Sequence, residues 1–329
     1  MFMDIEFDSG AVIPLPDVME LAQIAEAKNF DTVWGGEANN KDPIIMLAGI
    51  AARTTKVKLG TAIYHIFGRS PVSMAIMSAT LEELSQGRFL VGFGVSNQNI
   101  ARWHGATFEK PVRAMREYIE LFRKAYAGEK LSYHGEFFSS ENFKLAFTAP
   151  GPSVPIYVGT LGPQMARMAG RLCDGVIINM AVPSEVRRIG DVAREGAREA
   201  GRDPAKIEVV CKLRCSLHED LEAARRPLRQ IAAYYCLPDF YRDMMARVGF
   251  ADTVDRMRQV HREKGFRAAV ELISNDMLDE LPTVAAQSIE PIRERLARFE
   301  AAGANRVIIS YVPCSDDVTA ETRRFLDIF

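Results

Sequence analysis

Short apolar runs alternate with amphipathic stretches along most of the chain. Apolar residues recur at helical spacing between the runs, as Val18, Leu21, Ala22 and Ala25 do in an expected helix over 16–29. Continuous apolar runs are typical of strands buried in a parallel sheet. The pattern predicts strands over 3–7, 31–34, 57–63, 88–94, 155–159, 174–179, 207–217 and 305–312.

Helical stretches follow these strands and give the chain its repeating order. The expected helices cover 43–53, 70–85, 111–127, 163–172, 184–200 and 318–327, and one more ends at Gly303. Eight strands separated by helices predict an α/β fold, the (β/α)8 TIM barrel. An open doubly wound sheet gives similar local patterns, but the segment EFDSGAV after the first strand lacks the dinucleotide-binding glycine pattern, which weakens that alternative.

Two segments interrupt the alternation. In 98–150 a helix is followed by two β-type runs, 131–138 and 142–147, which predict a hairpin. The other segment, 218–285, is rich in charges and mostly helical in pattern. The chain is therefore expected to form a single domain over 1–329 with insertions near 98–150 and 218–285.

Composition and charge exclude several classes of function. The chain has 329 residues, 48% of them hydrophobic, which is enough for a large core, and a formal net charge of −2. This charge gives no general reason to bind nucleic acid or an anionic membrane, and no apolar stretch is long enough to span a bilayer. We therefore expect a soluble, cytoplasmic protein that acts on a small molecule.

The cysteines and histidines show no metal-binding or disulfide pattern. Five cysteines, an odd number, occur without paired CxxC units, so free thiols are expected. The histidines lack metal-ligand spacing, and there is no GxSxG nucleophile motif. No metal site is therefore expected, and chemistry carried by an organic cofactor is favoured. His65 and His104 are expected near the active-site end, where each is either a proton donor or simply packed.

Residues that follow the predicted strands are the candidates for a site, because a parallel barrel places its active site at the carboxyl ends of its strands. Trp34 and Glu37 follow the second strand and offer an aromatic face and an acid. The glycines of 92–97, which follow the fourth strand, let backbone approach a ligand closely. Core packing and an ordinary loop remain alternative explanations for these residues.

The stretch 159–165, GTLGPQM, joins a strand to a helix that begins near Pro163. Free N–H groups and the positive end of the helix dipole favour a phosphate at such a turn, and Thr160 adds a hydroxyl. An ordinary strand-to-helix turn has the same spacing, so both interpretations stay open.

Several segments together resemble the luciferase-like monooxygenase superfamily. They include FDTVWGGE, LEELSQGRFLVGFGVS, PIYVGTLGPQMARMAGRLCDGVIIN and LARFEAAGANRVII. Within that superfamily the chain is most similar to the branch that uses the deazaflavin coenzyme F420, which includes methylenetetrahydromethanopterin reductases. FMN-dependent relatives share most of these segments, so FMN is the alternative cofactor.

The resemblance implies roles for particular residues. It implies a non-proline cis peptide at Ala62-Ile63 that backs the cofactor ring, with Trp34 flanking the ring and Glu37 as the catalytic acid or base. The cofactor-binding residues that it implies are Ala62, Ile63, Gly94, Val95, Ser96, Asn97, Thr160, Leu161, Gly162 and Pro163.

One position departs from the pattern of the family. Many deazaflavin enzymes carry a histidine beside the acid that follows the second strand, where this chain has Ala38. Glu37 is then the nearest proton donor. The expected function is hydride transfer between F420 and a small organic substrate, in a homodimer. An FMN-dependent monooxygenase and a non-catalytic barrel without a redox cofactor are the alternatives.

Overall fold

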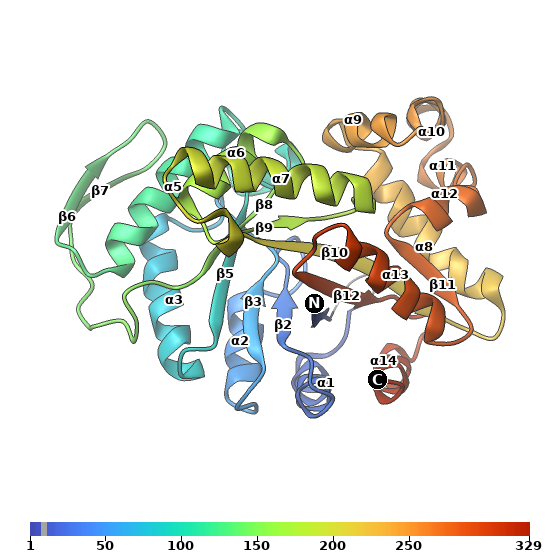
Figure 1. Ribbon diagram of the computed structural model, residues 1–329, viewed down its shortest axis with the longest axis horizontal. Helices are drawn as coiled ribbons and strands as arrows, with labels where there is room; N and C mark the ends of the chain where they lie inside the picture. The colour runs from blue at the N-terminus through green and yellow to red at the C-terminus, as the bar shows by residue number, and fades with distance from the viewer. Residues whose placement is uncertain (8–11) are drawn as a thin grey trace.

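The computed structural model describes residues 1–7 and 12–329, and parallel strands occupy its centre (Figure 1). Eight strands in this described part form a closed ring in which β9 pairs with β10 and β12 pairs with β1. The predicted (β/α)8 barrel is confirmed. In ring order the strands are β1 (Phe2–Glu6), β2 (Thr32–Gly35), β3 (Lys58–Thr61), β5 (Phe89–Gly94), β8 (Ile156–Gly159), β9 (Gly175–Ile178), β10 (Glu208–Leu217) and β12 (Arg306–Tyr311).

The third predicted strand, 57–63, differs from the structure. The strand β3 ends at Thr61, and a separate short strand, β4 (Tyr64–His65), pairs with β5. The peptide between them, Ala62-Ile63, is cis. The apolar run therefore continues through a break in the strand that hydrophobic pattern alone does not reveal.

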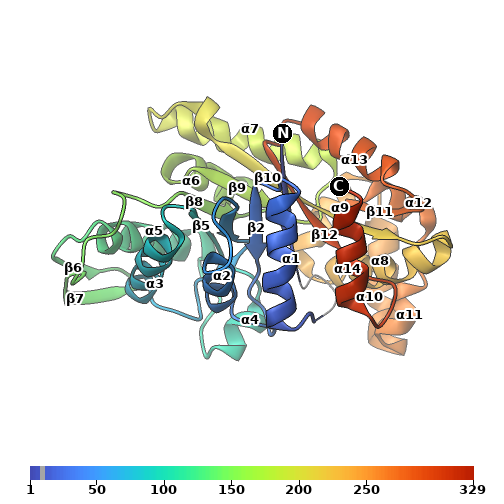
Figure 2. The same cartoon turned by 90° about the horizontal axis from the view of Figure 1, so that it is seen from below.

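Helices cover the outside of the barrel (Figures 1 and 2). Many begin with a proline at the first turn, where the missing N–H costs nothing, and Asp42 and Ser70 cap two of them. The helix α14 lies beside α1, so the two ends of the chain meet on one side of the barrel (Figure 2). The covering helices are α1 (Leu15–Ala27), α2 (Pro43–Ala51), α3 (Pro71–Ser85), α5 (Pro111–Tyr126), α6 (Pro163–Leu172), α7 (Pro183–Glu199), α8 (Leu221–Cys236), α13 (Glu290–Ala301) and α14 (Val318–Asp327).

The two segments that interrupt the alternation contain further elements. The first holds α4 (Gln98–Trp103) and the predicted hairpin, β6 (Leu131–His134) with β7 (Ser139–Phe143), which projects from one end of the molecule (Figure 1). The second is mostly helical, as predicted, but ends in a strand that the sequence pattern did not indicate, β11, which pairs with the end of β10. Its elements after α8 are α9 (Asp239–Arg247), α10 (Ala251–Lys264), α11 (Phe266–Val270), α12 (Asn275–Glu280) and β11 (Thr283–Ala286).

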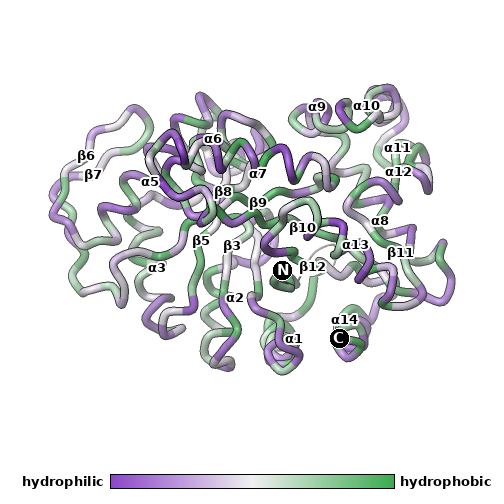
Figure 3. Tube along the Cα trace, in the orientation of Figure 1, coloured by the Kyte–Doolittle hydropathy of each residue, from purple (hydrophilic) through white to green (hydrophobic). Residues whose placement is uncertain are grey.

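Hydrophobic residues concentrate on the central strands, and the hydrophilic ones lie mostly on the outer helices and loops (Figure 3). All five cysteines are free thiols. Within residues 1–7 and 12–329, no helix combines the length and the apolar character needed to cross a bilayer.

A buried ion network closes the barrel near the start of its strands. The guanidinium of Arg306, at the start of β12, is 3% exposed and pairs with the carboxylates of Asp4, Asp31 and Glu208. Burial raises the pKa of Asp4 to about 7, although Arg306 and a hydrogen bond from the Trp34 indole oppose the rise. One arginine therefore offsets acids from several strands.

Replacing Arg306 by methionine should destabilise the fold strongly. Arg306→Met leaves three carboxylates without their shared cation, and loss of one partner from a buried pair costs about 3–5 kcal/mol. Urea unfolding measures this loss. In the control, Arg323→Met, the lost ion pair with Glu20 is exposed, so the free energy of unfolding should change little. Equal effects of the two substitutions would contradict the proposed importance of the network.

Candidate active site

The predicted site residues other than Trp34 lie where the barrel strands end, and we call this side of the barrel the strand-end face. Glu37 follows β2, Ile63 follows β3, Gly94 ends β5 and Thr160 follows β8. These strands are neighbours in a parallel ring, so their carboxyl ends point the same way. Residues far apart in sequence thereby share one face.

The peptide Ala62-Ile63, in the loop between β3 and β4, is cis, as the family resemblance implies. The carbonyl of Ala62 accepts a hydrogen bond from Lys212 Nζ at 2.8 Å. The carbonyl of Ile63 accepts one from the backbone N–H of Glu37 at 3.0 Å, and the N–H of Ala62 donates to Gly35 at 2.7 Å. Contacts from β10 and from the loop after β2 therefore hold the backbone on both sides of this peptide.

The side chain of Ile63 rests on glycines of two neighbouring strands. A Cβ added at Gly94 would lie 2.5 Å from Ile63 Cδ1, and one added at Gly159 would lie 3.0 Å from Ile63 Cγ2. Larger residues at these two positions would displace Ile63. The glycines after the fourth and fifth barrel strands thus serve close packing around Ile63.

Glu37 lies beside His65, although the two are distant in sequence. Its Oε2 is 3.1 Å from the His65 backbone N–H, which donates to it, and 3.2 Å from His65 Nε2. The Nδ1 of His65 accepts a hydrogen bond from the Gly68 N–H, which places the proton of a neutral ring on Nε2. This Nε2–H is buried without an aligned acceptor. An imidazole thus accompanies the acid after all, but it comes from β4 rather than from position 38.

Burial sets the protonation of this pair. It raises the pKa of Glu37 to about 7, and the nearby Asp42 carboxylate adds to the rise while the His65 N–H opposes it. Burial, together with the neighbouring His104 and Arg69, lowers the pKa of His65 to about 4. At neutral pH His65 is uncharged and Glu37 is partly protonated. A carboxylic acid with a pKa near the working pH is well suited to donate a proton.

The turn predicted to bind phosphate precedes α6. The N-cap of this helix is Gly162, and no side chain caps its first N–H groups. Thr160 bonds within the turn: its Oγ1 is 3.0 Å from the carbonyl of Gly162 and 3.3 Å from that residue's N–H. Leu161 and Gly162 are half-buried and Pro163 is exposed. The free N–H groups and the dipole of a ten-residue helix are features that an anion requires.

The loop after β5 is only partly available to a ligand. Val95, Ser96 and Asn97 are half-buried, and Ser96 has a positive φ of 48°. The side chain of Asn97 accepts hydrogen bonds from Asn99 and Ile100 and so caps α4. Asn97 therefore orders the loop with its side chain.

Trp34 lies inside the barrel and is 0% exposed. Its Nε1–H donates to Asp4 at 2.8 Å, and its ring meets Tyr157 edge-on. It belongs to a buried apolar cluster that includes Ala62. Trp34 thus supports the Ala62-Ile63 peptide from within the barrel, and the structure favours the core-packing explanation of this residue.

Three buried charges on the strand-end face were not among the residues expected for the site. Glu6 ends β1, while Lys212 and Arg214 face the barrel interior from β10. Lys212 forms an ion pair with Glu6, and Ser310 Oγ donates to Glu6 at 2.5 Å. Although burial opposes it, the charges of Lys212 and Arg214 lower the pKa of Glu6, so Glu6 is ionised. Charges at alternating positions within the run IEVVCKLRCSL were the available signal.

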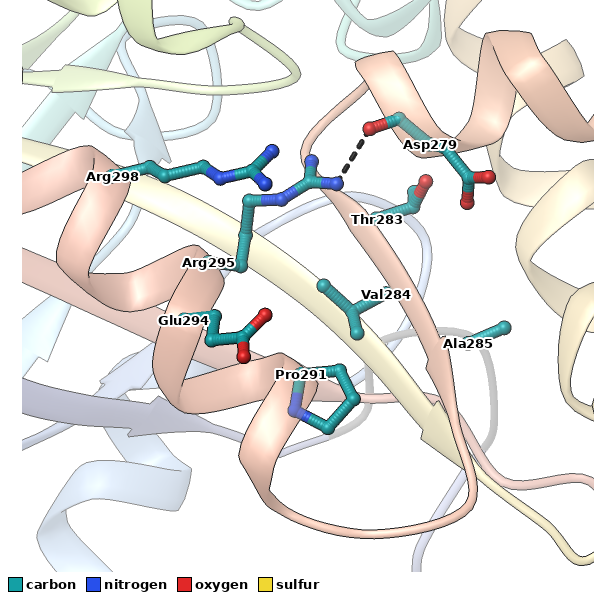
Figure 4. A pocket seen from close by; sticks show the side chains of 8 residues that line it. All are labelled: Asp279, Thr283, Val284, Ala285, Pro291, Glu294, Arg295 and Arg298. Carbon is teal, nitrogen blue, oxygen red and sulfur yellow. Dashed lines mark hydrogen bonds between the residues drawn. The ribbon is translucent and has the colours of Figure 1, made fainter.

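A surface pocket lies outside the barrel between β11 and α13 (Figure 4). Arg295 donates there to the carbonyls of Leu281 and Asp279 at 2.6 and 2.5 Å. Its donors are used to join α13 to α12 and β11, so this pocket is best explained as part of the packing between these elements. In the described part of the chain, no group of three or more His, Cys, Asp or Glu could hold a metal ion.

Comparison with known proteins places the chain among relatives with this barrel. The model of the luciferase-like monooxygenase family matches residues 3–306. The chain belongs to this family. A 5,10-methylenetetrahydromethanopterin reductase of Methanolobus tindarius is 32% identical over 222 residues, which cover 67% of this chain and 68% of that protein.

Two solved structures share this fold. The F420-dependent tetrahydromethanopterin reductase from Methanopyrus kandleri has a TM-score of 0.83 at 23% identity, covering 99% of this chain and 97% of that chain. An F420-dependent secondary alcohol dehydrogenase, solved with an F420–acetone adduct, has a TM-score of 0.80 at 25% identity, covering 100% and 98%. The predicted superfamily is confirmed.

The raised pKa of Glu37 predicts how stability depends on pH. The folded protein keeps this proton up to about pH 7, whereas the unfolded chain loses it near 4.5, so Glu37 lowers the free energy of unfolding as pH rises between these values. In Glu37→Gln this loss is absent. The stability of Glu37→Gln relative to wild type should therefore increase from pH 4.5 to 7 and then stay level, as measured by urea unfolding.

The exposed residue Glu109 provides the control for this measurement. Glu109→Gln should show no comparable rise relative to wild type. A stability difference for Glu37→Gln that is constant across this pH range would mean that Glu37 is ionised like an ordinary surface acid.

Proposed function

We propose that this protein transfers a hydride between coenzyme F420 and a small organic substrate at its strand-end face. One observation carries the proposal: Glu37, whose carboxyl group is partly protonated at neutral pH, donates its backbone N–H to the carbonyl of Ile63, on the face that also holds the uncapped N-terminus of α6. The relatives support the choice of cofactor, since both solved structures described above are named as F420-dependent.

The residues present fit such a cofactor. A Cβ added at Gly162 would meet no atom within 4 Å, so open space adjoins the start of α6. The free N–H groups of that helix would hold a phosphate, with Thr160, Leu161, Gly162 and Pro163 forming the turn. Ile63, placed by Gly94 and Gly159, would offer an apolar surface to a planar ring. Val95, Ser96 and Asn97 would border the same space.

Each residue has a task in the proposed reaction. Bound F420 would supply or accept the hydride. Glu37 would donate a proton to the substrate atom that gains negative charge during reduction, or accept it in the reverse direction. The backbone N–H of His65 would keep Glu37 in place, and the neutral His65 ring adds no charge that would favour the ionised form of Glu37. Trp34 and Lys212 would hold the Ala62-Ile63 peptide as a rigid support.

Cofactor titration tests the proposal. We expect saturable binding of F420, followed by fluorescence, and weaker or no binding of FMN. Saturable FMN binding without F420 binding would replace the proposal with an FMN-dependent monooxygenase, for which substrate-dependent oxygen consumption is the confirming measurement. Binding of neither cofactor would favour the non-catalytic barrel.

Removing the acid tests the role of Glu37. In Glu37→Gln, kcat should fall by about 10²–10⁴, the usual contribution of a general acid or base, because glutamine cannot supply the proton. F420 affinity should stay near that of wild type. The measurement is steady-state oxidation of reduced F420 with a substrate found by screening carbonyl and unsaturated compounds, and Glu109→Gln is the matched control. An unchanged kcat would remove Glu37 from the proton transfer.

A further inference from the structure

Arg214 lies deep in the strand-end face, close to the proposed support for the cofactor ring. It is on β10, two residues beyond Lys212, and both side chains face the barrel interior. Lys212 contacts Ala62 directly. Arg214 is 2% exposed, so its charge lies almost wholly out of water. A buried guanidinium normally pairs with a carboxylate.

The partners of Arg214 are all neutral. Its Nη1 lies 3.0 Å from Asn179 Oδ1 and 3.2 Å from Met180 Sδ, and its Nη2 lies 3.3 Å from Tyr235 Oη. The guanidinium carbon is 4.8 Å from the centre of the Tyr235 ring. Within residues 1–7 and 12–329, no carboxylate forms an ion pair with Arg214. The nearby acid Glu6 is already paired with Lys212 and bonded by Ser310.

A count of donors shows which side of the guanidinium is free. Of its five N–H groups, the two on Nη1 face Asn179 and Met180, and Tyr235 accepts at most one from Nη2. The Nε–H is buried without any partner. One N–H on Nη2 likewise has no partner. Nε and Nη2 form one edge of the planar group, the edge that grips both oxygens of a carboxylate.

Arg306, the other arginine buried in the described part of the chain, pairs with three carboxylates. Arg123 and Arg225 also have a buried Nε without a partner, but each pairs with a carboxylate, that of Asp174 or of Glu222.

Among the described residues around Arg214, the buried charges of Glu6, Lys212 and Arg214 leave one positive charge in excess. Burying an uncompensated charge is costly, so a group kept in this state for packing alone is unexpected.

We propose that Arg214 binds the carboxylate of an anionic organic substrate through its Nε–H and Nη2–H. The inference rests on the proposed function in one respect, which is that the substrate meets the cofactor at the strand-end face. Tyr235 from α8 and the Asn179–Tyr241 hydrogen bond, which reaches α9, hold the guanidinium in orientation. Residues of the segment 218–285 thereby help to select the substrate.

Binding of small carboxylates to the cofactor-free protein tests the proposal. The probes are benzoate and butyrate, each compared with its primary amide by calorimetric titration. We expect at least one carboxylate to bind wild type tenfold or more tightly than its amide. Arg214→Met should lose that preference, Arg214→Lys should keep only part of it, and the surface control Arg256→Met should keep it in full. Equal binding of acids and amides by wild type, or a preference that survives in Arg214→Met, would overturn the proposal.

Thermal unfolding separates a binding role from a structural one. Without ligand, Arg214→Met should melt at the same temperature as wild type or higher, because the substitution removes an unpaired buried charge. A clear fall in melting temperature together with unchanged carboxylate binding would show that Arg214 is structural.

Inorganic phosphate is tested alongside, and tighter binding of phosphate than of any carboxylate would also overturn the proposal. F420 is titrated in a separate experiment. If F420 does not bind, the proposed function is rejected, but the carboxylate measurement can still be interpreted.

Discussion

The hydrogen bond from Lys212 to the carbonyl of Ala62 is the contact on which the strand-end face depends. The same ammonium pairs with Glu6, so one buried cation joins β1, the break after β3, and β10. These strands come from distant parts of the sequence and lie on different sides of the ring. Without that contact the Ala62 carbonyl and the Glu6 carboxylate would both lose a donor inside the barrel, which is costly for either group. The position of Ile63, and of Glu37 bonded to it, follows from this arrangement.

The two ends of the barrel treat buried charge differently. Near the start of the strands, acids outnumber Arg306, and burial of Asp4 brings its pKa to about 7, which lowers the cost of that excess. Among the described residues Glu6, Lys212 and Arg214 of the strand-end face, the excess is positive, and an arginine cannot lose its proton to relieve it. A carboxylate can become neutral by taking up a proton, whereas a guanidinium stays charged and needs a partner of opposite charge. This difference in charge distinguishes the end of the barrel where the strands start, which stabilises the fold, from the strand-end face, where we propose that the reaction takes place.

Much of the fold was predictable because the strands of a closed parallel barrel are buried on both sides. The runs FDTVW and RVIISY carry that signal without help from distant residues. The strand β11 was missed because TVAA is short and only weakly apolar.

Of the site, Glu37, Ile63 and the turn at Thr160 were predictable from their places after strands and from the family resemblance. The contact of Glu37 with His65 was not predictable from the sequence. It depends on the break after Thr61, which turns β4 toward the loop after β2. Lys212 and Arg214 were overlooked because a single strand does not show which of its faces meets the interior.

The residues that position Ile63 and Arg214 come from two different sets of elements. The surface around Ile63 depends on β3, β5 and β8, whereas the neutral residues around Arg214 come from the loop after β9, from α8 and from α9. The strand β10 links the two sets, because it carries both Lys212, which contacts Ala62, and Arg214. Such a division allows natural variation to alter one set while the other is preserved. Related proteins that keep the glycines at 94 and 159 but replace the region of Tyr235 and Tyr241 would then retain the same cofactor while accepting a different range of substrates, which makes α8 and α9 the natural place to begin redesigning selectivity.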